Sequence, residues 1–244
     1  MKMLASNSPA SRLYLFLKYN FIKSVFLTFT FLALLLLPNF EASATKFMVG
    51  GFTWECVGQD SFLIKLTIYR DCNGTNLGDA QVDIKCSSNG SFIKQLTIQK
   101  PSPIDVTPTC ASSCNRCQSS NCSFPYGIEK YVFQELVVFN STSCCELTLN
   151  YSACCRNTTI TTGAASNYLY ADAKLNRCLS PCDNSPEFTE PAVDILCNGQ
   201  DAILNYGVFD TDVTQSGNLS DSLVFEWAEP KGSGGTPIPY TGQY

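Results

Sequence analysis

The chain has 244 residues, with 14 cysteines and no histidine. The missing histidine excludes Ser-His-Asp and Cys-His nucleophilic sites within the chain, as well as zinc sites with histidine ligands. Acidic residues outnumber basic ones by 21 to 16, and the first 44 residues hold four of the bases and one acid, so the rest carries a net charge of −8. This charge argues against binding to nucleic acid.

The N-terminus has the pattern of an export signal. Two lysines precede an uncharged run of 14 residues, Ser24 to Leu37. Ala42 and Ala44 then form an A-x-A cleavage pattern, which predicts a signal peptide over residues 1–44. The alternative is an uncleaved signal anchor, although such a run is short for a membrane span. We therefore expect export to an oxidising compartment, with membrane contact only through the signal peptide during export.

The exported part has the pattern of short strands separated by turns. Apolar and polar residues alternate from Phe62 to Tyr69, which predicts a half-buried strand. Ala80 to Cys86 and Ser91 to Gln99 flank Asn89-Gly90, and an Asn-Gly pair favours the positive φ angles of a tight hairpin turn. Prolines and small polar residues dominate from Pro101 to about Pro125, so we expect no regular element there.

Three further segments of this region have strand patterns. Ile128 to Phe139 contains alternating apolar residues, and we interpret it as a strand, although its Glu and Lys content also suits a helix. Cys145 to Cys155 places apolar residues such as Leu147 on one face and polar residues such as Asn150 on the other. Tyr168 to Leu175 is another predicted strand.

A change of composition at Ser185-Pro186 predicts a domain boundary near residue 184. The strands expected beyond it are Ile195 to Cys197, Ala202 to Phe209 and Ser222 to Trp227. Three strands are too few to close a seven-stranded sandwich, so residues 184–244 are expected to be the start of a truncated second domain. The predicted fold is thus all-β: a disulfide-rich, antiparallel, sandwich-like domain over residues 45–183, then a partial Ig- or cadherin-like β domain, after an N-terminal signal helix.

Two cysteine doublets, Cys144-Cys145 and Cys154-Cys155, lie at the ends of one predicted strand. Neighbouring strand residues point to opposite faces, so Cys145 and Cys155 share the apolar face. Ten residues at about 3.3 Å each separate same-face cysteines by roughly 33 Å, whereas a disulfide needs Cα atoms within about 7 Å. These four cysteines therefore cannot pair with one another along a straight strand, and each is expected to reach a neighbouring strand or loop.

Four more cysteines form the pattern Cys110-x3-Cys114-x2-Cys117-x4-Cys122. The C-x-x-C within it suits zinc or redox chemistry, but an exported chain with an even number of cysteines favours disulfides, and no βαβ context supports a redox role. We expect disulfides from all the cysteines, in a pairing that the sequence does not determine: Cys56, Cys72, Cys86, Cys110, Cys114, Cys117, Cys122, Cys144, Cys145, Cys154, Cys155, Cys178, Cys182 and Cys197.

Two groups of charged residues have a functional and a structural interpretation. Calcium is the one cofactor that the sequence suggests, because carboxylate oxygens that suit it are offered by Asp210, Asp212 and Asp221. The structural alternative is that these residues belong to a solvated acidic loop. Arg70-Asp71 is expected to be a strand-end ion pair rather than a catalytic acid and base. No Gly-rich phosphate loop, paired-carboxylate site or nucleophile elbow is evident, and we expect no enzyme activity.

The sequence also contains two tryptophans and several glycosylation motifs. Trp54 and Trp227 are expected in the core or in an interface. Asn-x-Ser/Thr sequons, which would mean heavy glycosylation in a eukaryotic secretory pathway, occur at Asn73, Asn89, Asn121, Asn140, Asn150, Asn157 and Asn218.

Several stretches of the chain are similar, in the same order, to stretches of one protein family: Val49-Gly-Gly-Phe-Thr-Trp-Glu-Cys-Val-Gly58, Leu66-Thr-Ile-Tyr-Arg-Asp-Cys72, Tyr151-Ser-Ala-Cys-Cys-Arg-Asn157, Asn184-Ser-Pro-Glu-Phe-Thr-Glu-Pro191, Asp221-Ser-Leu-Val-Phe225 and Pro237-Ile-Pro-Tyr240. They resemble the N-terminal region of large cell-surface proteins of gliding bacteria, which usually carry a gliding-motility-associated C-terminal domain or a type IX secretion sorting signal. Members often have His before the first Gly-Gly, where this chain has Met48-Val49. The resemblance implies export across two membranes and display at the cell surface.

These features together predict a non-catalytic, secreted or cell-surface protein with a structural, adhesion or gliding-motility-associated role. Its expected partners are other cell-surface proteins or extracellular glycans, and not nucleic acid. The alternative is an extracellular carbohydrate- or ligand-binding module that uses exposed Tyr and Trp side chains as platforms.

Overall fold

The computed structural model describes residues 19, 22–29, 47–108, 113–140, 142–157, 160, 163–164, 167–192, 201, 203, 207–212 and 222–239. The chain divides into two compact units, Met1–Ala42 and Ser43–Tyr244. In the first unit, residues 22–29 are helical. Within the described residues, no helix combines the length and the apolar character that crossing a bilayer requires. The signal peptide stays a prediction, since its cleavage site lies outside the described residues.

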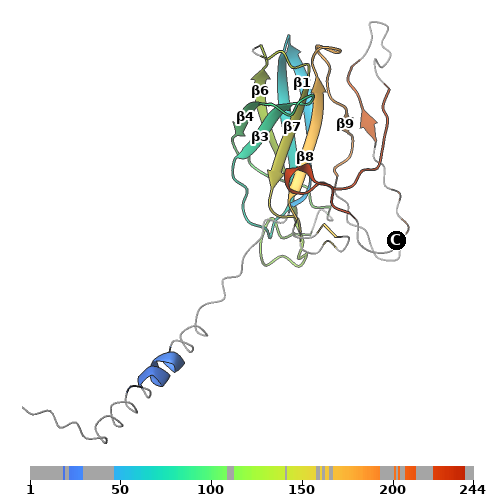
Figure 1. Ribbon diagram of the computed structural model, residues 1–244. Helices are drawn as coiled ribbons and strands as arrows, with labels where there is room; N and C mark the ends of the chain where they lie inside the picture. Colours follow the sequence, from blue (N-terminus) through green and yellow to red (C-terminus); the bar gives the residue numbers. More distant parts are fainter. Residues whose placement is uncertain are drawn as a thin grey trace, which may run out of the picture. The chain divides into compact units, whose positions relative to one another are not determined.

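The second unit is mostly β and is built from antiparallel strands in a sandwich-like arrangement (Figure 1). Sheet A has the strand order β1-β2-β6-β5, and sheet B has the order β4-β3-β7-β8. Their bounds are β1 Phe47–Gly58, β2 Ser61–Asp71, β3 Ala80–Cys86, β4 Phe92–Ile98, β5 Ile104–Asp105, β6 Ile128–Val138, β7 Glu146–Ala153 and β8 Leu169–Asn176. A short ribbon pairs β9 Glu187–Phe188 with β10 Val208–Phe209, and the 3-10 turn η1 covers Ser233–Gly235.

One hydrophobic core contains residues from both sheets. Phe62, Ile64, Leu66 and Ile68 alternate along β2 and have no exposed surface. Leu147 of β7, in sheet B, belongs to the same buried cluster. Each fully buried side chain of this kind stabilises the fold by about 1.5–3 kcal/mol, so the period-two pattern both specifies the strands and holds the two sheets together.

The strands predicted between Phe62 and Leu175 are confirmed. The hairpin of β3 and β4 also forms, but its turn is longer than a two-residue Asn-Gly turn: the Cys86 amide donates to the Ser91 carbonyl. Gly90 has a φ of 69°, whereas Asn89 has a negative φ, and the Asn89 side-chain oxygen accepts the Ser91 N–H. The prediction that the proline-rich segment contains no regular element is wrong, because β5 lies within this segment and pairs with β6.

The prediction for the strands beyond residue 184 is only partly right. Ser222 to Trp227 forms no strand, and its Trp227 is 99% exposed, so the core or interface prediction for this tryptophan is not met within the chain. Trp54, in contrast, belongs to the core. Ala202 to Phe209 is reduced, among its described residues, to β10, and Ile195 to Cys197 lies outside the described residues. The failure has a physical reason: a strand needs a hydrogen-bonding neighbour, which an alternating sequence does not supply by itself.

Candidate functional site

Disulfides fix the ends of the strands to the loops around them. Those between described residues are Cys56–Cys182, Cys72–Cys117, Cys86–Cys144, Cys114–Cys122, Cys145–Cys178 and Cys154–Cys155. Cys110 and Cys197 lie outside the described residues. The two cysteines of the C-x-x-C motif, Cys114 and Cys117, bond to other cysteines and not to each other.

The two cysteine doublets behave differently. Cys144 bonds to Cys86, and Cys145 bonds to Cys178 beyond the end of β8. Cys154 and Cys155 bond to each other, so the prediction that each of them reaches a neighbouring strand or loop is wrong. The physical reason is that β7 ends at Ala153, so Cys154 and Cys155 lie beyond the strand, where adjacent side chains need not point to opposite faces.

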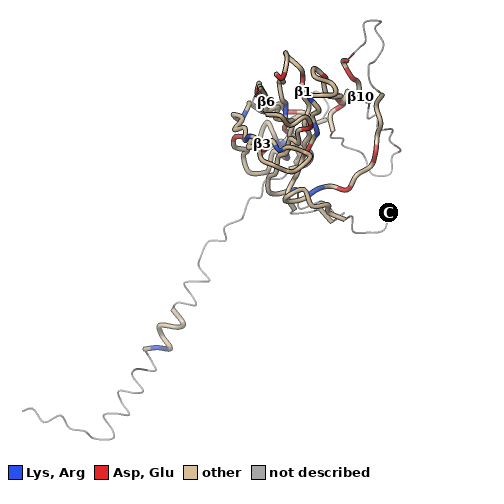
Figure 2. The backbone as a smooth tube through the Cα atoms, turned by 45° about the horizontal axis from the view of Figure 1, so that its top comes forward, with Lys and Arg blue, Asp and Glu red and all other residues tan. Residues whose placement is uncertain are grey.

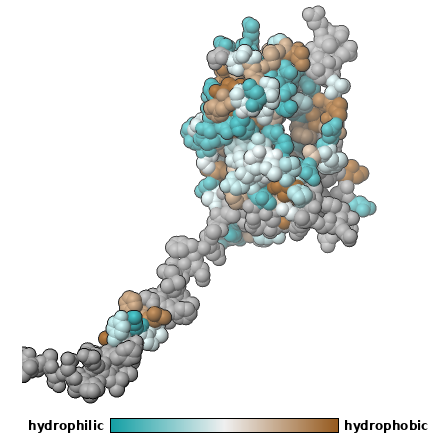
Figure 3. Space-filling model, in the orientation of Figure 1, coloured by the Kyte–Doolittle hydropathy of each residue, from teal (hydrophilic) through white to brown (hydrophobic). Residues whose placement is uncertain are grey.

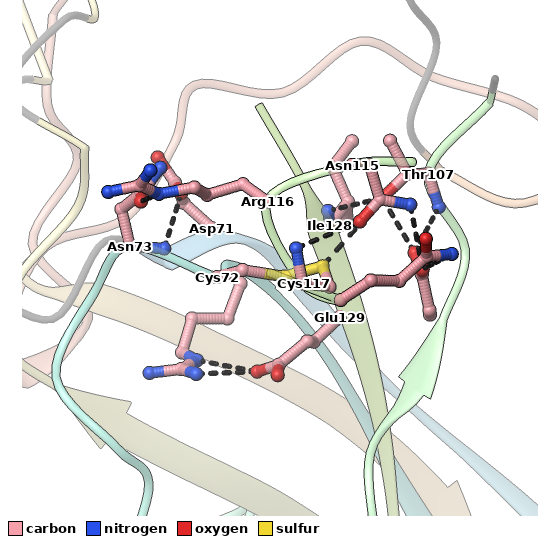
Figure 4. The surroundings of a disulfide bond; sticks show 12 residues. Asp71, Cys72, Asn73, Thr107, Asn115, Arg116, Cys117, Ile128 and Glu129 are labelled. Carbon is pink, nitrogen blue, oxygen red and sulfur yellow. Dashed lines mark hydrogen bonds and ion pairs between the residues drawn. A yellow bond between two sulfur atoms is a disulfide. The ribbon is translucent and has the colours of Figure 1, made fainter. Parts of the chain in front are cut away.

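A buried polar cluster lies beside the Cys72–Cys117 disulfide (Figure 4). Arg70 is 2% exposed, and its guanidinium donates to the Glu129 carboxylate at 2.5 and 3.2 Å. The same guanidinium donates to the carbonyls of Gly74 and Thr75 in the turn that follows β2. Arg70 thus pairs with a carboxylate of the neighbouring strand. The predicted ion pair between Arg70 and Asp71 is not the main contact of Arg70.

Tyr131 completes this cluster from β6. Its hydroxyl donates to Glu129 Oε2 at 2.9 Å, and the Arg70 guanidinium lies 5.9 Å from the centre of its ring. Burial, together with the bond to Glu129, raises the pKa of Tyr131 to about 12. These ionisable groups contact one another in the interior, so their role is to hold β2, β6 and the following turn together.

A second network holds the cysteine-rich loop against β5 and β6 (Figure 4). Asn115, 2% exposed, donates to Asp105 Oδ2 at 2.7 Å and accepts the Cys117 N–H at 2.8 Å. Thr107 donates to Asp105 Oδ1 and accepts the Ile128 N–H. Burial acts to raise the pKa of the Asp105 carboxyl, but the bonds from Thr107 and Asn115 outweigh it and lower that pKa below its usual value.

The predicted calcium ligands take part in protein contacts. Asp212 accepts two hydrogen bonds of 2.6 Å from Asn184, one from its backbone N–H and one from its side-chain amide. Asp210 accepts the Asp212 N–H at 2.9 Å, and Asp221 lies outside the described residues. Across the described part of the chain, no group of three or more His, Cys, Asp or Glu side chains is arranged to hold a metal ion. Calcium binding at these residues stays a prediction.

The segment that follows β8 docks on the outer edge of β1. Trp54 donates its backbone N–H to Ser185 Oγ at 2.8 Å, and the Ser185 N–H donates to the Trp54 carbonyl at 3.0 Å. The indole N–H of Trp54 donates to the Asp183 carbonyl, and Asn184 accepts the Cys56 N–H. The Cys56–Cys182 disulfide anchors the same segment covalently. Sequence reasoning missed this docking, although Trp54 and Cys56 alternate with exposed residues in β1.

The candidate binding site is a groove of about 430 Å³ on the outer face of sheet A. We call it the outer-face groove: β1, β2 and β6 form its floor, and residues 186–192 form its wall. Its volume is in the range of small-molecule sites, about 300–1,000 Å³. Gly51 lies in the floor, where a Cβ atom would meet nothing within 4 Å.

Two lysines lie among the charged residues that line the outer-face groove. Lys65 lies 3.6 Å from Glu55 and 3.8 Å from Glu187, so its charge is compensated. Lys130 lies 5.9 Å from the centre of the Tyr69 ring and makes no ion pair with another described residue. The groove therefore combines an aromatic ring and small residues with side chains of both charges, Lys65 and Lys130 on the floor and Glu187 and Glu190 in the wall.

The surface of the second unit carries mixed charges and also exposed apolar side chains, such as Phe92, Leu179 and Trp227. Acidic and basic positions are interspersed along its backbone (Figure 2), and hydrophilic residues cover much of the face seen in Figure 3. Among the predicted sequons, Asn89, Asn121 and Asn140 are exposed, whereas Asn150 is 7% exposed. Asn73 has its side-chain amide bonded to Pro125 and Arg116, Asn157 is half-buried, and Asn218 lies outside the described residues. Burial thus argues against a glycan on Asn150.

Comparisons of the chain with protein-family models, with curated proteins and with solved structures find no match. The resemblance to surface proteins of gliding bacteria therefore stays a prediction.

Proposed function

We propose that this protein is an exported, non-catalytic cell-surface protein with a structural, adhesion or gliding-motility-associated role. The disulfide framework is the observation that carries the proposal. It fastens strand ends to loops around the second unit, and disulfides of this kind form and persist in oxidising compartments outside the cytosol. The sequence resemblance to surface proteins of gliding bacteria supports the more specific part of the role.

The non-catalytic part of the proposal has support from the way in which ionisable groups are used. Arg70 and Tyr131 are buried, and both donate hydrogen bonds to the Glu129 carboxylate. Catalytic sites, in contrast, gather perturbed ionisable groups in an accessible cleft. In the outer-face groove, Lys65 pairs with carboxylates, and a nucleophile with an adjacent base is absent among the described lining residues.

The experiment is localisation and deletion in the source organism. A tagged chromosomal copy should be degraded when intact cells are treated with an external protease, and a cytosolic control protein should survive. Deletion of the gene should reduce surface spreading or attachment, and the wild-type gene should restore it. Protection of the tagged protein in intact cells, together with unchanged spreading and attachment in the deletion strain, would overturn the proposal.

The outer-face groove favours a second candidate function, the binding of an extracellular carbohydrate or other small ligand. A glycan array with the refolded protein tests it. Gly51→Trp should abolish a true groove signal, because its side chain would fill the open floor, whereas Gly78→Trp, at another position with nothing within 4 Å, should leave it unchanged. An array without a signal, or a signal equal in both variants, would reject the groove as a glycan site.

A further inference from the structure

One stretch of the second unit, residues 224–229, is exposed along its whole length, and we call it the exposed segment. All six of its residues are exposed, and it forms neither a helix nor a strand. A strand or helix that packs on a neighbour buries one of its faces, so this run of exposed residues means that the segment buries neither face. Within it, Phe225 is 64% and Trp227 is 99% exposed. The chain thus presents two large aromatic side chains on an accessible backbone.

The other exposed aromatic residues in the described part of the second unit have a backbone that the fold already holds. Phe92, Phe188 and Phe209 belong to paired strands. The carbonyls of Tyr126 and Tyr168 accept hydrogen bonds from residues elsewhere in the chain, at 3.1 and 3.0 Å. A protease takes its substrate as an extended chain, so a backbone that is already bonded must first open locally, at a cost in free energy. Of these aromatic positions, the ones in the exposed segment need the least opening.

The disulfides hold the chain before the exposed segment but not the chain after it. All 14 cysteines lie at or before Cys197. The disulfides between described residues therefore fasten the strands and loops of the sandwich, and none reaches beyond the exposed segment. A cut in the exposed segment leaves no covalent link between the disulfide-bonded sandwich and the chain that follows the cut.

The chain after the exposed segment contacts the sandwich at β8. Lys231 Nζ lies 2.6 and 2.8 Å from the two carboxylate oxygens of Asp172, and Arg156 donates to the Lys231 carbonyl at 3.2 Å. η1 lies beside β8 (Figure 1), where a Cβ atom added to Gly235 would be 3.2 Å from the Tyr170 ring. The ion pair contributes little, because its two side chains are 39% and 30% exposed. A separate peptide also loses translational and rotational freedom when it binds, so these contacts hold a continuous chain but not a separate piece.

We propose that the exposed segment is a processing site, which an endoprotease with a pocket for large aromatic side chains cuts after Phe225 or Trp227. Water hydrolyses the peptide bond that follows the aromatic residue, and the products are a new carboxylate and a new amino group on Glu226 or Ala228. The cut releases the chain that follows it and leaves the disulfide-bonded sandwich intact. The proposal rests on the proposed export only for the access of the protease, and the site itself is tested on the purified protein.

Limited proteolysis of the purified, oxidised protein with chymotrypsin, which cuts after large apolar residues, tests the site. Mass spectrometry should place the first cut within residues 43–244 after Phe225 or Trp227. The variant Phe225→Ser with Trp227→Ser should slow the first cut in this range at least about tenfold, because the remaining exposed aromatic residues of the described part must open before they are cut. Phe92→Ser, which removes an aromatic side chain that is 60% exposed in β4, is the matched control and should leave that rate unchanged. A first cut elsewhere in residues 43–244, or equal rates in the two variants, would overturn the proposal.

Release, and processing in the source organism, are measured separately. After inhibition of the chymotrypsin, size-exclusion chromatography should separate the chain after the cut from the sandwich, and a piece that stays bound would contradict the release. In protein recovered from the outside of source cells, labelling of amino termini should find Glu226 or Ala228 as a new N-terminus. Protein that reaches the outside and is recovered only uncut would overturn the processing role. A protein that stays inside the cells would contradict the proposed export instead, and the chymotrypsin experiment would still decide the site.

Discussion

Arg70 and Glu129 are directly opposite each other on β2 and β6, and their side chains form an ion pair in which Arg70 is 2% and Glu129 is 16% exposed. Arg70 continues the same face as Ile64, Leu66 and Ile68, so a charge occupies a position that the strand pattern reserves for an apolar residue. Its five N–H donors make this tolerable, because the Glu129 carboxylate and two turn carbonyls accept hydrogen bonds from it.

Removal of one partner should therefore be costly. Glu129→Gln leaves the Arg70 charge buried without a counter-charge, and we expect a loss of about 3–5 kcal/mol in the free energy of unfolding. Urea unfolding with the disulfides intact measures it. Lys174→Gln, which breaks a pair on an exposed surface, is the control and should leave the midpoint nearly unchanged. Equal effects of the two substitutions would contradict the structural role given to this cluster.

Two adjacent glycines of β1 should respond differently to alanine. A Cβ atom at Gly50 would lie 2.7 Å from Ile68 Cδ1 and 3.2 Å from the Thr67 carbonyl oxygen, whereas one at Gly51 would meet nothing. Gly50→Ala should destabilise the fold by about 1–3 kcal/mol through overpacking. Gly51→Ala should be neutral or slightly stabilising, since it reduces the entropy of the unfolded chain. The same urea measurement applies to both, and destabilisation by Gly51→Ala would contradict the open floor of the outer-face groove.

The contribution of each disulfide to stability should increase with the length of the loop that it closes. Cys72–Cys117 spans 45 residues and Cys114–Cys122 spans 8, which corresponds to about 4 and about 2.5 kcal/mol from loop entropy. Cys154–Cys155 joins adjacent residues and should contribute least by this mechanism. Paired Cys→Ser variants, compared by urea unfolding, test the order. A larger loss from the Cys154/Cys155 variant than from the Cys72/Cys117 variant would reverse it.

We expect the free energy of unfolding to fall at alkaline pH, because Tyr131 and Tyr151 are buried. Burial raises the pKa of Tyr131 and of Tyr151 to about 12, from an ordinary value of 10.0. The folded state therefore holds these protons more tightly than the unfolded chain does, so this stabilisation is present below pH 10 and is lost as pH rises toward about 12.

Rapid ultraviolet titration of tyrosinate should show a late-titrating fraction that exposed tyrosines such as Tyr126 do not contribute to. Tyr131→Phe should remove part of this fraction. A single transition near pH 10 for all tyrosines in the folded protein would contradict the burial of these two hydroxyls.

The sequence predicts the sandwich strands well because burial on one face imposes a period of two, as in Phe62–Ile68 and Leu147–Leu149. The sequence predicts strands less well where a strand forms only if a neighbouring strand can pair with it. Ser222–Trp227 has the alternating pattern without a described neighbour, and β5 has a neighbour without the pattern. The outer-face groove was not predicted, because its wall depends on where residues 186–192 leave β1, which is a tertiary relationship.

Mapping of the disulfides by mass spectrometry tests the account most directly. The protein is taken from the outside of source cells, its free thiols are alkylated, and it is digested without reduction. The account predicts cross-linked peptides for Cys56–Cys182, Cys72–Cys117, Cys86–Cys144 and Cys145–Cys178. Alkylated thiols at these cysteines, or their pairing with other partners, would contradict it.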